Sequence, residues 1–187
     1  YIQIYKQGDT KMQEETLKDI NTTNLLQQHV MALLRRRKLK PEDVSEEVLS
    51  LQDESGISVL DICIEQFKEP VTDDYGRTVP RAFFLVCKPD CGLPLHFRKV
   101  KEILQIARED GWSVAHEAAY QGSLPESMMT EDILKLTTRV GCSVAYHVAR
   151  RKNLPEWAKR QKDILLLSNG YGDYVAHMLC KHVRSTH

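Results

Sequence analysis

The sequence predicts an all-α fold, a helical-repeat solenoid of stacked antiparallel helix pairs, because two markers recur along it in phase. The first marker is a glycine signature, with offsets of 30 and 31 residues between copies at Gly111-Trp-Ser-Val-Ala-His116, Gly141-Cys-Ser-Val-Ala-Tyr146 and Gly172-Asp-Tyr-Val-Ala-His177. The second is Leu-Pro ahead of Ile-Leu, at Leu124-Pro125 before Asp132-Ile-Leu134 and at Leu154-Pro155 before Asp163-Ile-Leu165. A unit of this kind holds two helices, and only a neighbouring pair can cover their shared apolar face.

The same phase extends upstream, from Leu93-Pro94 to Gly111 and from Leu39-Lys-Pro41 to Gly56. We therefore expect a leader with a short helix over residues 1–24 and a repeat domain over residues 25–187. The alternation in residues 1–5 fits either a short strand or a disordered leader. The units are expected near 25–55, 56–75 (truncated, because Glu69-Pro70 ends its helix), 76–110, 111–140 and 141–171, with a terminal half-unit at 172–187.

Capping residues predict where the helices of each unit begin and end. Ser113 and Ser143 are placed to cap a first helix, and Gly122 or Asn153 is placed to close it. Proline then opens the second helix, where no backbone donor is needed, as at Pro41, Pro125 and Pro155. Upstream of the units, Lys11 to Ile20 reads as a helix, and Asn24 with Gln27 forms a capping box for a helix from Leu25 to Leu39.

The amino-acid composition limits the classes of partner that we expect the chain to bind. The 187 residues carry 26 basic and 26 acidic side chains, so no global field draws the chain to nucleic acid or to an anionic membrane. No apolar run approaches the roughly 18 residues of a membrane span, and no signal peptide is visible, so we expect a soluble protein. The odd number of scattered cysteines fits reduced thiols and a cytoplasmic location: Cys63, Cys87, Cys91, Cys142 and Cys180.

With the units aligned, the segment Asp110-Gly-Trp-Ser-Val-Ala-His116-Glu-Ala-Ala119-Tyr-Gln-Gly122 resembles the ankyrin repeat. The resemblance covers roughly residues 30–187, with falling quality toward the N-terminus. It implies a structural hydrogen bond near the helix start for His116 and His177, and it implies a protein-binding function without a cofactor. Valine replaces the usual proline of the turn, Leu-Pro replaces the usual start of the second helix, and the period is about 30 instead of 33. We therefore expect short or absent hairpin loops.

One cluster of cysteine and histidine residues suggests an alternative, catalytic function. Cys87, Cys91 and His96 lie near one another in the stretch that lengthens the 76–110 unit. They could belong to a zinc site or form a cysteine nucleophile with a histidine base, so a zinc- or cysteine-dependent hydrolase is the alternative function. The spacing is not that of paired zinc ligands, and a fourth ligand would have to come from elsewhere, which favours a plain loop insertion.

Surface residues of the first helices form the expected binding site. Equivalent positions in successive units predict a continuous stripe for a partner protein, because aromatic and arginine side chains dominate binding hot spots; its members are Trp112, Glu117, Tyr120, Gln121, His147, Arg150, Arg151 and Lys181. Tyr171 and Tyr174 are further candidates, although the loop aromatics could equally pack against adjacent loops.

Basic clusters recur at the same place in their units, at Arg35-Arg-Arg-Lys38 and at Arg150-Arg-Lys152. Cations there complement a helix C-terminus, and an acidic partner or a nucleic-acid backbone is the alternative. The sequence therefore predicts a non-catalytic protein-interaction module whose partner is another protein, with nucleic acid disfavoured by the zero net charge.

Overall fold

The computed structural model describes residues 25–87 and 92–184. The chain divides into two compact parts, residues 1–65 and 66–187, and the boundary falls within helix α2 (Val59–Lys68). The chain is mostly helical, with one small two-stranded sheet among the described residues. The helix expected over Lys11 to Ile20, the cap at Asn24 and the alternating residues 1–5 lie outside the described residues.

The N-terminal part contains a helix over residues 25–35, the 3-10 turns η1 (Pro41–Asp43) and η2 (Glu46–Val48), and the start of α2. The first helix was expected to reach Leu39, and that boundary was wrong. Arg37 adopts a left-handed conformation with φ 55°, and the Lys38 N–H donates to the Leu33 carbonyl, which closes the helix early. The core of this part is apolar: Val30, Met31, Leu34, Val44, Val59 and Cys63.

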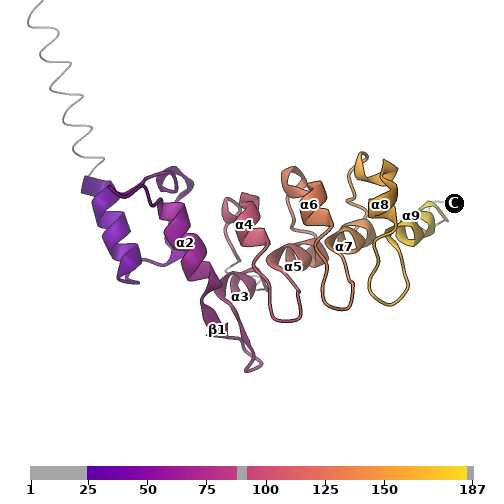
Figure 1. The fold of residues 1–187 in the computed structure, drawn as a ribbon, viewed down its shortest axis with the longest axis horizontal. Coiled ribbons are helices and arrows are strands. Elements are labelled where there is room, and N and C mark those ends of the chain that lie inside the picture. The colour runs from indigo at the N-terminus through magenta and orange to yellow at the C-terminus, as the bar shows by residue number, and fades with distance from the viewer. Residues whose placement is uncertain (1–24, 88–91, 185–187) are drawn as a thin grey trace, which may run out of the picture. The chain divides into compact units, whose positions relative to one another are not determined.

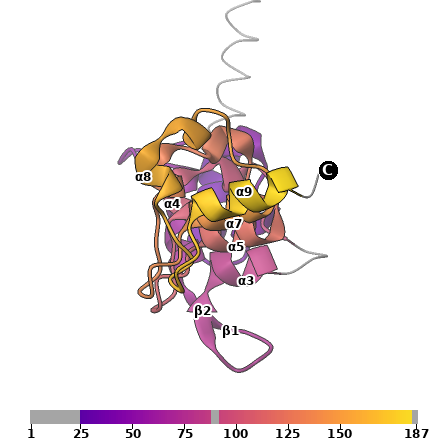
Figure 2. The same ribbon diagram turned by 90° about the vertical axis from the view of Figure 1, so that its right-hand side faces the viewer.

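In the C-terminal part, long and short helices alternate along the chain. Strands β1 (Pro70–Thr72) and β2 (Thr78–Pro80) are followed by α3 (Arg81–Cys87), η3 (Phe97–Lys99), α4 (Lys101–Leu104), α5 (Val114–Gln121), η4 (Glu126–Met128), α6 (Glu131–Leu134), α7 (Val144–Arg150), η5 (Ala158–Arg160), α8 (Lys162–Leu165) and α9 (Val175–Arg184). Helices α3, α5, α7 and α9 pack side by side in one row, while α4, α6 and α8 form a second row (Figures 1 and 2).

Hairpin loops precede the long helices, so the expectation of short or absent hairpins is corrected. Antiparallel bridges close them, for example between Ala107 and Ser113 and between Thr137 and Ser143. The signature glycines are the reason, since all five have a left-handed backbone with φ between 74° and 96°, which a tight turn requires: Gly56, Gly76, Gly111, Gly141 and Gly172.

The hairpin at residues 70–80 is the exception to an all-α fold, and it corrects that expectation. Val71 pairs with Val79 in the antiparallel register of β1 and β2. β-Branched residues favour this pleated pairing. The Asp73 carboxylate accepts the backbone N–H groups of Tyr75 and Arg77 at 2.9 and 2.8 Å and so fixes the turn between the strands.

The helices of the second row are short. Each consists of a 3-10 turn followed by a four-residue helix, as in η4 with α6 and in η5 with α8. Pro125 precedes a 3-10 turn, not an α-helix, and Pro41 is the first residue of one. Burial of the Ile and Leu side chains in the short helices fixes them to the core: Ile103, Leu104, Ile133, Leu134 and Ile164.

Most of the predicted helix caps are present. The hydroxyl oxygens of Ser113 and Ser143 accept the backbone N–H groups of residues 116 and 146, and Gly122 closes α5 with φ 77°. The prediction for Asn153 was wrong. Lys152 takes the left-handed position with φ 64°, and the Asn153 N–H donates to the Val148 carbonyl instead.

Among the described residues, no helix combines the length and the apolar character needed to cross a lipid bilayer.

Candidate functional site

A cavity of about 500 Å³ lies where the β1–β2 hairpin, α3, the 107–113 hairpin and α5 meet. Its volume is within the range of small-ligand and side-chain pockets. Val79 and Phe83 are buried at its base, and Phe84 is half-buried. The remaining lining comes from Asp73, Asp74, Tyr75, Arg77, Cys87, Arg108, Trp112 and Glu117.

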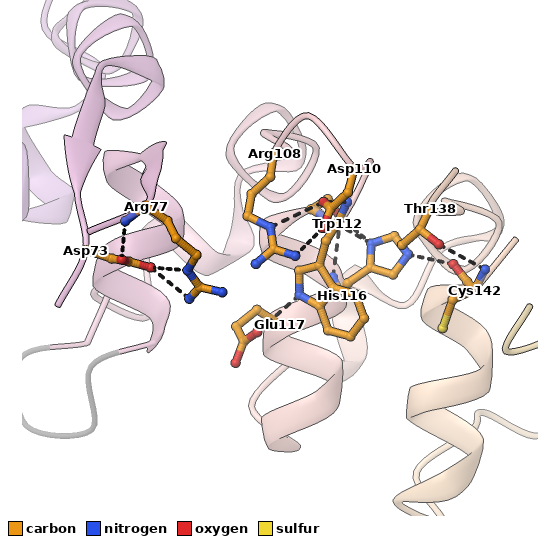
Figure 3. Close-up of polar contacts among 10 residues, drawn as sticks. Asp73, Arg77, Arg108, Asp110, Trp112, His116, Glu117, Thr138 and Cys142 are labelled. Atoms are coloured by element: carbon orange, nitrogen blue, oxygen red, sulfur yellow. Dashed lines mark hydrogen bonds and ion pairs between the residues drawn. The ribbon is translucent and has the colours of Figure 1, made fainter. Parts of the chain in front are cut away.

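Two arginines reach the cavity from two different hairpins, and each is paired with an aspartate of its own hairpin. Arg77 donates to Asp73 through Nε at 2.8 Å, and its Nη2 lies 2.7 Å from the same carboxylate. Arg108 is paired with Asp110 in the same way. Figure 3 shows the two guanidinium groups extending toward the space between the hairpins.

Aromatic rings hold the same two guanidinium groups. The Arg77 guanidinium carbon lies 5.1 Å from the centroid of the Tyr75 ring, and that of Arg108 lies 4.8 Å from the centroid of Phe83. Cation–π contact of this kind adds to the ion pairs and restricts the rotamers. Both arginines are therefore positioned and largely neutralised before any ligand arrives.

Glu117 on α5 is held between two neutral donors. Trp112 Nε1 donates to its Oε2 at 3.1 Å, and Gln121 Nε2 donates to its Oε1 at 2.8 Å. Figure 3 shows the Trp112 indole reaching down from the hairpin to this carboxylate. The structure thus brings together three members of the predicted stripe, and it fixes the direction of one carboxylate.

An aromatic cluster joins α5 to α7. The ring centroid of His147 lies 5.1 Å from that of Trp112 and 5.7 Å from that of Tyr120. His147 is only 6% exposed, so it belongs to the interior of this cluster and not to the exposed stripe where the sequence placed it. Cys142 Sγ lies 3.2 Å from its Nε2.

The other stripe residues lie at the surface of the C-terminal part. Tyr120 is 46% exposed, and Gln121, Arg150, Arg151 and Lys181 are exposed as well. Arg151 links two units, since its Nε donates to the Tyr120 carbonyl at 2.7 Å while its guanidinium lies over the Tyr120 ring. Lys181 lies 3.7 Å from the carboxylate of Asp173.

His116 has the structural role that the sequence implied. The backbone N–H of Ser113 donates to its Nδ1 at 3.1 Å, which leaves the proton on Nε2 to donate to the Cys142 carbonyl at 3.1 Å. Burial lowers the pKa of His116 to about 4, so the ring is neutral. His177 repeats the first contact, because its Nδ1 accepts the Tyr174 N–H at 3.2 Å.

The Cys87, Cys91 and His96 cluster gains no support. Cys91 lies outside the described residues, and no group of three or more metal-binding side chains occurs within residues 25–87 and 92–184. Desolvation and the charge of Glu117 raise the pKa of Cys87 to about 12, whereas a cysteine nucleophile needs a lowered pKa. The His96 ring packs instead on Phe97, with 4.3 Å between ring centroids.

The basic clusters mark helix ends, as the helix-dipole interpretation requires. Arg37 and Lys152 occupy the same left-handed position after their helices. Arg35 is ion-paired with Asp53 in the N-terminal part. Arg35 therefore has a local ionic partner, and Arg37 and Lys152 lie where their helices end.

Most of the cavity lining was not predicted from the sequence, which indicated only Cys87, Trp112 and Glu117 as candidates. Tyr75, Arg77, Phe83 and Arg108 were not among the candidates. A signal was available, because Asp73 followed by Gly76 and then Arg77 is the pattern of a hairpin whose turn carries an aspartate–arginine pair.

Comparisons with protein-family models, with curated proteins and with solved structures find no match to this chain.

Proposed function

We propose that this chain is a degenerate ankyrin-like repeat protein that binds another protein and has no chemistry of its own. The observation that carries the proposal is an exposed surface on α5 and α7, in which the Tyr120 ring, 46% exposed, lies under the Arg151 guanidinium beside Arg150. Exposed aromatic and arginine side chains held in fixed positions are typical of binding hot spots. We call Tyr120, Gln121, Arg150 and Arg151 the α5–α7 surface.

The order of elements supports the ankyrin-like part of the proposal. A hairpin with a left-handed glycine, a long helix with a serine cap and a short second helix follow one another at Gly111 and again at Gly141. The histidine that bridges neighbouring units, His116, occupies the position implied by the family resemblance. In such an arrangement the stability of each unit comes from its neighbours, and the side chains of one row of helices remain available for a partner.

The described titratable groups support a role without catalysis. Burial raises the pKa values of Cys63, Cys87 and Cys142, so these thiols stay protonated near neutral pH. His116 and His147 are buried and neutral. None of these groups is poised near neutral pH as a base or nucleophile must be. We also propose a cytoplasmic location, which the free thiols of Cys63, Cys87, Cys142 and Cys180 favour.

Comparative capture tests the proposal. Tagged wild-type protein and the double variant Tyr120→Ala with Arg150→Ala are incubated with a lysate, and captured proteins are quantified by mass spectrometry. We expect the variant to lose a set of proteins that the wild type enriches, because two large contacts are removed.

A matched double variant controls for the removal of an exposed aromatic ring and an exposed arginine elsewhere on the protein. Trp157→Ala with Arg160→Ala removes an exposed aromatic ring and an exposed arginine from the region of the second row of helices. It should keep the set that the wild type captures, and circular dichroism should show the wild-type helix content in both variants, because Tyr120→Ala also removes a contact of the aromatic cluster with His147. Equal capture by all three proteins would remove the α5–α7 surface as the binding site.

A further inference from the structure

The cavity beside α5 has an apolar base of a size that suits one bulky side chain. Val79 is 2% and Phe83 is 3% exposed, and the half-buried Phe84 ring and the Cys87 thiol complete the apolar part of the lining. The volume of about 500 Å³ leaves room for an anchoring side chain together with the backbone that carries it.

The charges in the lining do not favour an anion, despite the two arginines. Arg77 and Arg108 each spend their Nε and Nη2 groups on their own aspartates, Asp73 and Asp110. An incoming carboxylate or phosphate would have to compete with these pairs. It would also face Asp74 and Glu117, which line the same cavity.

Two carboxylates of the lining, Asp74 and Glu117, have no ion pair among the described residues, and Glu117 is the half-buried one. Within the described residues its carboxylate accepts hydrogen bonds only from the neutral groups of Trp112 and Gln121, and it has no cationic partner. These two bonds orient it but do not neutralise it. A half-buried carboxylate without a counter-charge favours a cation on the ligand, because pairing offsets the cost of its partial desolvation.

We propose that this cavity binds an extended segment of a partner protein that inserts one bulky apolar side chain and pairs an adjacent lysine or arginine with Glu117. This inference rests on the proposed function and names the chemistry of the partner. The apolar side chain enters the cavity beside the Cys87 thiol and the Phe84 ring, above the buried Phe83 ring that the Arg108 guanidinium already covers, and the cation of the neighbouring residue meets the Glu117 carboxylate beside the Trp112 indole. The free N–H groups of Arg77 and Arg108 remain available to carbonyl groups of the segment.

Three pools of fluorescein-labelled nonapeptides test the proposal by fluorescence polarisation. All pools have a central leucine or phenylalanine, flanked in the first by lysine and arginine, in the second by serine and glycine, and in the third by aspartate and glutamate. We expect the basic pool to bind most tightly, and its affinity to fall as salt is added. Tightest binding by the acidic pool, or equal binding by all three, would overturn the proposal.

Substitutions assign the binding to this cavity. Glu117→Gln keeps an oxygen that can accept from Trp112 but removes the charge, so the affinity for the basic pool should fall about tenfold while that for the neutral pool stays. Glu109→Gln removes one acidic charge from an exposed position in the same hairpin, away from the lining, and should change neither affinity. An unchanged affinity of Glu117→Gln for the basic pool would contradict the proposal.

Filling the cavity provides a test that does not depend on charge. Cys87→Trp places a large ring in the lining, and it should abolish binding of all peptides while circular dichroism and the melting temperature stay near the wild type. If Cys87→Trp instead dissolves a dimer seen by sedimentation, a second copy of the chain occupies the cavity and the proposal is wrong. The Tyr120 and Arg150 variant could lose partner capture while the wild type binds none of the peptide pools. That result would support the proposed function and overturn this inference alone.

Discussion

His116 Nε2 donates a hydrogen bond to the carbonyl oxygen of Cys142, at 3.1 Å, and so connects the start of α5 to the hairpin of the following unit. The same ring accepts the Ser113 N–H through Nδ1, and it is fully buried. One side chain therefore both caps its own helix and fixes its neighbour, which only the neutral tautomer with a proton on Nε2 can do.

Replacing His116 should destabilise the fold much more than replacing His177, which has the equivalent position in a later unit. His116→Ala removes one of the two hydrogen bonds to the Cys142 carbonyl, which the Thr138 N–H also reaches, and it opens a cavity, so we expect a loss of about 3 kcal/mol. His177→Ala removes the cap on the Tyr174 N–H, a long contact with Asp173 and a ring contact with Tyr174, all from a side chain 54% exposed, and about 1 kcal/mol is expected. Urea unfolding measures both. Equal losses would show that the link between units carries no stability.

Stability should fall on mild acidification. Burial lowers the pKa of His116 to about 4, and burial with the charges of His116 and Arg150 lowers that of His147 to about 4, while Asp110 acts on His116 in the opposite direction. Between pH 6.5 and pH 4 the unfolded chain therefore binds more protons than the folded one. Stability should be constant above pH 6.5 and lost below it, by up to about 1.4 kcal/mol per pH unit for each ring.

Chemical unfolding between pH 7.5 and 4.5 measures this dependence, and His147→Phe should reduce the slope by about half, because one of the two titrating rings is gone. A flat profile in the wild type over this range would mean that the imidazoles are hydrated or paired in the folded chain.

Two neighbouring glycines should respond differently to the same substitution. Gly170 and Gly172 both have positive φ, 80° and 96°. A Cβ on Gly172 would meet nothing within 4 Å, whereas one on Gly170 would lie 2.1 Å from the Val140 carbonyl oxygen. We expect Gly172→Ala to cost about 1 kcal/mol for the left-handed backbone alone, and Gly170→Ala to cost about 3 kcal/mol by thermal unfolding. Equal costs would contradict the close approach of Gly170 to the Val140 carbonyl in the preceding hairpin.

The thiol of Cys87 should react slowly, although the residue is exposed. Its pKa is raised to about 12, so almost none of it is thiolate at pH 8. Mass spectrometry after iodoacetamide treatment should show modification at least about tenfold slower than at the exposed Cys180. Faster labelling of Cys87, or zinc retained by the purified protein, would revive the alternative of a cysteine- or zinc-dependent activity.

The sequence predicted the helices of this chain well where local signals specify them. The serine caps at Ser113 and Ser143 and the glycine at Gly122 lie where the pattern placed them, because a cap depends on residues a few positions away. The hairpins were missed because the short period was attributed to trimmed hairpin loops, whereas the left-handed signature glycines close a turn before each long helix begins.

The site was less predictable, because it depends on contacts between units. His147 was expected at the surface by its equivalence to Glu117 in the preceding unit, but packing against Trp112 and Tyr120 turns its ring inward. Conversely, Arg77 reaches the cavity only because the β1–β2 hairpin lies beside α3 and α5. Spacing within a repeat does not contain that information.

Hydrogen–deuterium exchange of the chain, with and without the protein that it captures, tests the central claim most directly. Binding on the first-helix row predicts slower exchange in residues 108–121 and 144–151 and little change in residues 126–135 and 156–165 of the second row. Protection confined to the second row, or no protection in residues 108–121, would contradict the account.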